Sequence, residues 1–106
     1  NEWVSEEIRH PGQRERLLHL VTQNDGMIAL PGGIGTLSEV SLAWSLMQTG
    51  EIPERPLVLL GPTWRETIRV YAQVEYIRPR DMDLLYLATS AETAVAYVRQ
   101  RLADRL

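Results

Sequence analysis

Residues 27–39 read MIALPGGIGTLSE, and this stretch decides the fold. A short apolar run ends at Pro31, three glycines follow within the next four positions, and a helical pattern begins after them. This order predicts a buried strand, a tight turn and a helix. The turn is expected to present backbone N–H groups at the positive end of the helix dipole, a setting that favours an anion such as phosphate.

The turn is followed by Thr36 and, three residues later, by Glu39, and this spacing is that of a helix capping box. The residues leave two interpretations of Glu39 equally open. It is either the structural N3 glutamate of the cap, or a functional carboxylate that holds ribose hydroxyls or acts in catalysis. The glycines also allow a purely structural interpretation, in which they form a tight strand–helix turn that binds no ligand. They match neither the dinucleotide-binding pattern G-x-G-x-x-G nor the lysine-containing Walker motif.

Strand and helix patterns alternate along the rest of the chain. We expect strands over residues 26–30, 57–60 and 84–88, and helices over 13–23 and 36–48, from Thr63 onward, and from residues 89–92 onward. Gly26 and Gly50 are expected to end the first two helices, and residues 77–83 to form a loop. Residues 1–11 are expected to form a short strand or an arriving connection.

Apolar residues at helical spacing predict which helix faces are buried. The expected inward positions are Val40, Ala43, Trp44 and Met47 in the second helix, and Ala94, Val95, Val98 and Leu102 in the last.

This alternation predicts an α/β fold, a Rossmann-like doubly wound parallel sheet with helices on both faces and strands buried on both sides. Residues 1–106 are expected to form one such domain. Because three strands make a small sheet with an exposed apolar edge, we expect the C-terminal half of a larger domain, or a sheet that pairs with another chain. Ligands of such sheets lie beyond the C-terminal strand ends, where residues 31–36 fall.

Composition narrows the function classes. The 106 residues carry a net charge of −3 without a long basic run, which disfavours nucleic acid and anionic membranes as partners. No cysteine and two histidines exclude thiolate and histidine-rich metal sites, and all eleven basic residues are arginine, which excludes a lysine Schiff base. We expect no metal, no cofactor, no membrane span and a cytoplasmic location.

The motif at residues 31–39, P-G-G-x-G-T-x-x-E, resembles the signature of the LOG (Lonely guy) phosphoribohydrolases, long described as lysine decarboxylase-like. The resemblance implies metal-free hydrolysis of the N-glycosidic bond of a nucleoside 5′-monophosphate such as AMP. The products would be the base and ribose 5-phosphate. It also implies a homodimer or a larger homo-oligomer.

The same resemblance assigns roles to individual residues. It makes Arg16, on the preceding helix, and Glu39 the catalytic pair. It gives phosphate and ribose binding to Gly32, Gly33, Gly35 and Thr36. The chemistry agrees, since a carboxylate can stabilise an oxocarbenium-like state and arginine can hold a phosphate or the departing base.

Two other functions stay open at this point. One is a non-catalytic module that binds a nucleotide or molybdenum cofactor, as in other members of the superfamily. The other is a relic that retains only the fold. From the residues alone, the simpler interpretation of Arg16 is a solvated surface residue.

Overall fold

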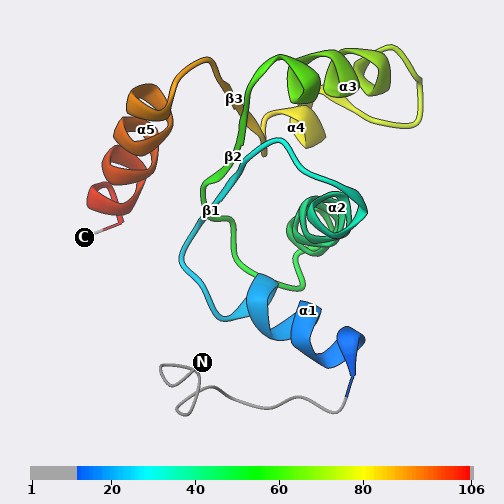
Figure 1. Cartoon of the computed structure of the whole chain (residues 1–106), viewed down its shortest axis with the longest axis vertical. Helices are drawn as coiled ribbons and strands as arrows, with labels where there is room; N and C mark the ends of the chain where they lie inside the picture. The colour runs from blue at the N-terminus through cyan, green and yellow to red at the C-terminus, as the bar shows by residue number, and fades with distance from the viewer. Residues whose placement is uncertain (1–11, 106) are drawn as a thin grey trace.

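The computed structural model describes residues 12–105, so the expectation for residues 1–11 lies outside the described part of the chain. Figure 1 shows the order of helices and strands. The elements are α1 (Gln13–Thr22), β1 (Met27–Ala29), α2 (Ile34–Gln48), β2 (Leu57–Leu60), α3 (Pro62–Ala72), α4 (Pro79–Met82), β3 (Tyr86–Ala88) and α5 (Ala91–Ala103).

The three strands form one parallel sheet in the order β1-β2-β3. Ile28 pairs with Val58, and Val58 pairs with Tyr86, so these three side chains share one face of the sheet. The central strand β2 is the most deeply buried, because its apolar run LVLL is covered on both faces.

Helices cover both faces, with α5 on one side and α1, α2 and α3 on the other (Figure 1). The larger core lies under α1–α3 and comprises Val21, Ala29, Val40, Ala43, Met47, Ile52, Leu57, Leu59, Trp64 and Ile68. A smaller cluster under α5 contains Val58, Ala88 and Ala94. The predicted α/β class and the Rossmann-like parallel arrangement are therefore confirmed.

Two burial predictions are wrong. Ile28 is 36% exposed, so β1 is not buried on both faces, because α5 packs on β2 and β3 and leaves the β1 end of that face open. Val95 is 41% exposed, because Ala94 is the residue of that helix turn that faces β2.

The starts of two helices also differ from the prediction. Gly33, not Thr36, is the N-cap of α2, and Leu37 N–H donates to the carbonyl oxygen of Gly33 at 3.1 Å. Within residues 12–105, no side chain forms a capping hydrogen bond at this helix start. The capping-box interpretation is therefore wrong. Helix α3 begins at Pro62 rather than at Thr63, since proline at the first helical position needs no N–H partner.

Smaller differences concern element ends. α1 ends at Thr22, before Gly26, whereas Gly50 ends α2 with a φ of 80°, as predicted. Residues 77–83 contain the short helix α4 instead of forming only a loop. Ser90 caps α5, its hydroxyl accepting from Thr93 N–H at 3.1 Å, which agrees with the expected start of that helix.

Candidate functional site

The glycine turn lies at the C-terminal edge of the sheet. It follows β1, and α3 begins immediately after the neighbouring strand β2. Because parallel strands end at the same edge, the first turns of α2 and α3 lie next to each other.

A hollow of about 260 Å³ lies between these two helix starts. Its walls come from the turn and α2 on one side and from α3 on the other. The lining residues are Pro31, Gly32, Gly33, Ile34, Leu37, Thr63, Trp64 and Thr67. A hollow of the same volume lies between α2 and the segment around α4, where it is lined by Trp44, Tyr76 and Asp81 among others, but no residue of the turn borders it.

The first turn of α2 offers free backbone donors beside the hollow. The N–H groups of Ile34, Gly35 and Thr36 precede the first intrahelical bond, which Leu37 makes to Gly33. Within residues 12–105, no side chain caps them. They therefore form the positive end of a 15-residue helix, and an anion is the partner that this geometry favours.

The four predicted phosphate and ribose residues all lie on this turn, but in different surroundings. Gly32 packs directly against Thr36, whose side chain is half-buried. Gly33 and Gly35 are exposed and face open space. Gly32 and Gly33 line the hollow, whereas Gly35 and Thr36 lie in the first helical turn beside it.

Glu39 lies in the second turn of α2 and is half-buried. With the cap at Gly33, Glu39 stands too far along the helix to serve as an N3 residue. Its carboxylate makes no hydrogen bond or ion pair with another residue of the 12–105 segment.

Glu39 does not border the 260 Å³ hollow. At 100° per residue it shares a helix face with Ala43, one turn later, and lies opposite Ile34, which lines the hollow. Ala43 meets Leu20 and Val21 of α1 around a small cavity, so this face of α2 is the one directed at α1.

Arg16 is exposed near the start of α1, the helix that packs against α2. Arg16 and Glu39 thus come from neighbouring helices. Among the described residues, however, the ion pairs are Glu66–Arg69 and Arg78–Asp81, and none joins Arg16 to Glu39.

The side of the hollow formed by α3 was not foreseen from the sequence. Thr63 was expected only at the start of a helix, and neither Thr67 nor Trp64 was assigned to a site. Trp64 is buried, and its indole Nε1–H donates to the carbonyl of Leu30 at 3.1 Å. The available signal was the position of these residues directly after the neighbouring strand, at the same sheet edge as the glycines.

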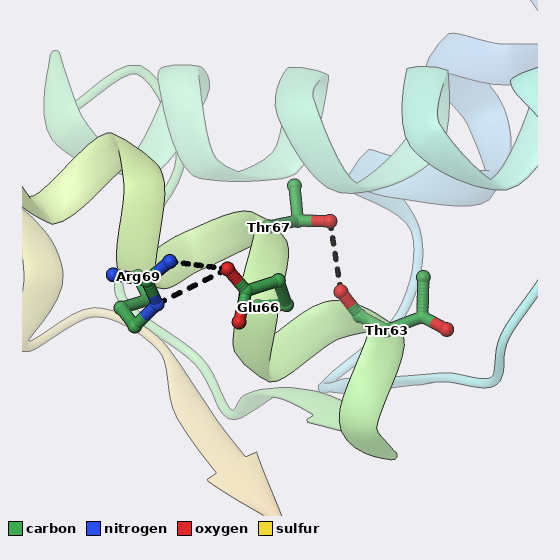
Figure 2. Close-up of polar contacts among 4 residues, drawn as sticks. All are labelled: Thr63, Glu66, Thr67 and Arg69. Atoms are coloured by element: carbon green, nitrogen blue, oxygen red, sulfur yellow. Dashed lines mark hydrogen bonds and ion pairs between the residues drawn. The ribbon is translucent and has the colours of Figure 1, made fainter.

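Helix α3 also carries the Glu66–Arg69 pair, drawn in Figure 2 with Thr63 and Thr67. Arg69 Nε donates to Glu66 Oε2 at 3.1 Å, and a second guanidinium nitrogen contacts the same oxygen. This hydrogen bonding, reinforced by the positive charge of Arg69, lowers the pKa of the Glu66 carboxyl. The pair is exposed to solvent and does not line the hollow.

Residues 12–105 hold no group of three or more histidine, aspartate or glutamate side chains placed to bind a metal ion. Over the same residues, no helix has the length and apolar character needed to cross a membrane.

A protein-family model described as "Possible lysine decarboxylase" matches residues 1–98 of the chain. The comparison with curated proteins finds no match.

Proposed function

The chain belongs to the family described as possible lysine decarboxylases, and within it we propose a nucleoside 5′-monophosphate phosphoribohydrolase. The proposed reaction hydrolyses the N-glycosidic bond of a nucleotide such as AMP. Water supplies the new hydroxyl at the anomeric carbon, and the base leaves with a proton on the nitrogen that held the sugar. The products are the free base and ribose 5-phosphate.

The reaction in the family description has less support from this chain. A decarboxylase that depends on a pyridoxal Schiff base needs a lysine amine, and all eleven basic residues here are arginine. The chain therefore offers no residue to carry that chemistry.

The observation that carries the proposal is the half-buried carboxylate of Glu39, which has no partner within residues 12–105 and lies on the same helix as the amides of the turn, one helical turn further along and on the side that faces α1. Cleavage of a glycosidic bond passes through an oxocarbenium-like state, which a nearby carboxylate stabilises. The same carboxylate can accept a proton from the attacking water. Because Glu39 caps nothing, these roles account for a carboxylate that is otherwise unexplained.

The turn supplies the binding half of the mechanism. The amides of residues 34–36 would hold the 5′-phosphate, and Gly32, Gly33 and Thr36 would border the ribose. Binding energy from the phosphate, which does not react, would then orient the bond that breaks. Arg16 would approach from α1 to hold either the phosphate or the departing base.

The direct test is incubation of the chain with AMP, followed by chromatography for adenine and an assay for ribose 5-phosphate. We expect both products in equal amounts, and their loss in Glu39→Gln. AMP binding without any release of adenine, unchanged in Glu39→Gln, would refute the hydrolase and support the non-catalytic binding module. If AMP neither binds nor reacts, the nucleotide assignment itself is wrong.

A nucleotide substrate also fits the cytoplasmic location expected from the sequence. Fractionation of cells that produce the tagged protein tests that location.

A further inference from the structure

Trp64 connects two parts of the chain that lie far apart in sequence. Its indole Nε1–H donates to the carbonyl oxygen of Leu30 at 3.1 Å, and its side chain is only 6% exposed. Leu30 is the last residue before Pro31 and the glycines. The hydrogen bond therefore holds the point at which the chain leaves β1 and enters the turn.

Other contacts show that the start of α3 packs closely against this turn. Gly61 has a φ of 108°, and a Cβ at this residue would lie 3.4 Å from Cγ of Pro31. Gly61 N–H in turn donates to the carbonyl of Ala88 at 3.1 Å. The segment that carries Trp64 is thus joined to β3 on one side and packs against Pro31 on the other.

In the part of the chain that the structure describes, few other hydrogen bonds hold the turn itself. The pairing of β1 with β2 ends at Ala29, one residue before Leu30. Pro31 has no N–H to donate, and no described side chain caps the amides of the first helical turn. The indole of Trp64 is consequently a specific polar restraint on the backbone between β1 and α2.

We propose that Trp64 is a positioning residue that holds the glycine turn with its amides directed at the nucleotide phosphate. The proposal rests on the proposed function, because it assigns Trp64 a role in ligand binding through the turn. This role differs from that of a tryptophan that only fills the core, because removal of such a residue would lower stability without a selective effect on the turn.

Trp44 provides a matched control within the same chain. Its Nε1–H also donates to a backbone carbonyl, that of Asp81 at 2.8 Å, and its ring is also partly buried. That bond joins α2 to α4 and touches no residue of the turn. Trp64→Phe and Trp44→Phe therefore remove equivalent donors, and only the first should affect the turn.

The test combines backbone NMR relaxation with nucleotide binding. In Trp64→Phe we expect the order parameters of the Gly32 and Gly33 amides to fall from about 0.85 to below about 0.6, the range of flexible backbone. We expect the AMP dissociation constant and KM to rise about tenfold, the effect of losing one buried hydrogen bond, with kcat changed less than about twofold. Trp44→Phe should change neither the turn amides nor KM, although both variants lower the melting temperature.

If Trp64→Phe does not fold, β-(3-benzothienyl)alanine at position 64 removes the N–H group while keeping the size and shape of the ring. Unchanged order parameters in the turn, or equal effects on KM from the two tryptophan variants, would overturn the proposal. Should the wild-type chain not bind AMP, the proposed function fails, and the relaxation data alone decide whether Trp64 holds the turn.

Discussion

Gly32 and Thr36 pack against each other so closely that a side chain at position 32 would force the Thr36 side chain or the turn to shift. A Cβ at Gly32 would overlap the Thr36 hydroxyl and stand 3.0 Å from the Thr36 Cβ. Rotation of the threonine side chain can move the hydroxyl away, but the Thr36 Cβ is fixed by the helix backbone and would remain in a tight contact. The turn therefore folds back onto the first turn of the helix that follows it.

Gly32→Ala should destabilise the chain by about 1–3 kcal/mol, because the backbone of the turn must shift to relieve the overlap. The free energy of unfolding from urea titration measures this loss. Thr36→Ala removes the overlapping hydroxyl, so Gly32→Ala should cost less in that background. The same cost in both backgrounds would show that the Gly32–Thr36 contact does not constrain the turn.

Gly35→Ala should have the opposite effect on stability. Gly35 lies in the first turn of α2 with nothing within 4 Å of a Cβ, and alanine is the better helix former by up to about 1 kcal/mol. If a phosphate approaches the bare backbone here, the methyl group obstructs it. We therefore expect a higher melting temperature together with weaker AMP binding by calorimetry. A stabilised variant with unchanged AMP affinity would remove Gly35 from the site.

Glu39→Gln should lower kcat for AMP hydrolysis by about 10²–10⁴, the usual range for losing a catalytic acid–base group. The melting temperature should change little, because the carboxylate forms no ion pair or hydrogen bond within residues 12–105. Steady-state kinetics and thermal unfolding of the same sample separate the two effects.

Arg16→Gln distinguishes the two roles proposed for the arginine. If Arg16 holds the phosphate, the variant should raise KM for AMP but leave the slow cleavage of adenosine unchanged. If it holds the departing base, both substrates should be cleaved more slowly. Full activity on AMP would exclude Arg16 from the mechanism.

The sequence predicted the alternation of strands and helices and the position of the turn, because both follow from local signals. Apolar runs separated by helical patterns dictate a parallel sheet, and Pro31 with its glycines marks a strand end. The start of α2 was mispredicted, because the rule for helix caps favours Thr36 whereas the extended backbone at Gly33 lets the helix begin three residues earlier. That error concealed the most informative property of Glu39, its freedom from a capping role.

The contribution of α3 could not be predicted from local pattern. Trp64 and Leu30 are 34 residues apart, and only the pairing of β1 with β2 brings them within hydrogen-bonding distance. Likewise, the exposure of Ile28 depends on where α5 packs, since a three-residue apolar strand has the same sequence whether one face is covered or both.

The Glu66–Arg69 pair should act on acid stability and not on catalysis. Because the folded-state pKa of Glu66 is lowered below its ordinary value of 4.5, the stabilisation is present above that value and is lost as pH falls through the folded pKa. Carbon-13 NMR titration of the carboxyl should show this pKa rising in Arg69→Gln. Both side chains are exposed, so added salt should weaken the effect. Loss of AMP cleavage in Glu66→Gln would contradict the assignment of this pair to the surface.

The outer edge of β1 should mediate association between copies of the chain. Within residues 12–105, β1 pairs with β2 on one side only, and Ile28 and Leu30 beside that edge are 36% and 58% exposed. An unpaired edge with apolar neighbours offers both backbone hydrogen bonds and a surface to bury. We expect sedimentation velocity to give a dimer or a larger oligomer.

Ile28→Lys should shift this equilibrium toward the monomer, because a charge beside the edge strand opposes pairing and burial. Val70→Lys is the matched control, since Val70 is 51% exposed on α3, away from the β1 edge, and its replacement should leave the oligomer intact. A monomer at every wild-type concentration would refute association. If the oligomer dissociates equally in both variants, the contact between copies does not lie at the β1 edge. The reason is that Val70→Lys changes the net charge by the same amount as Ile28→Lys but does not touch β1.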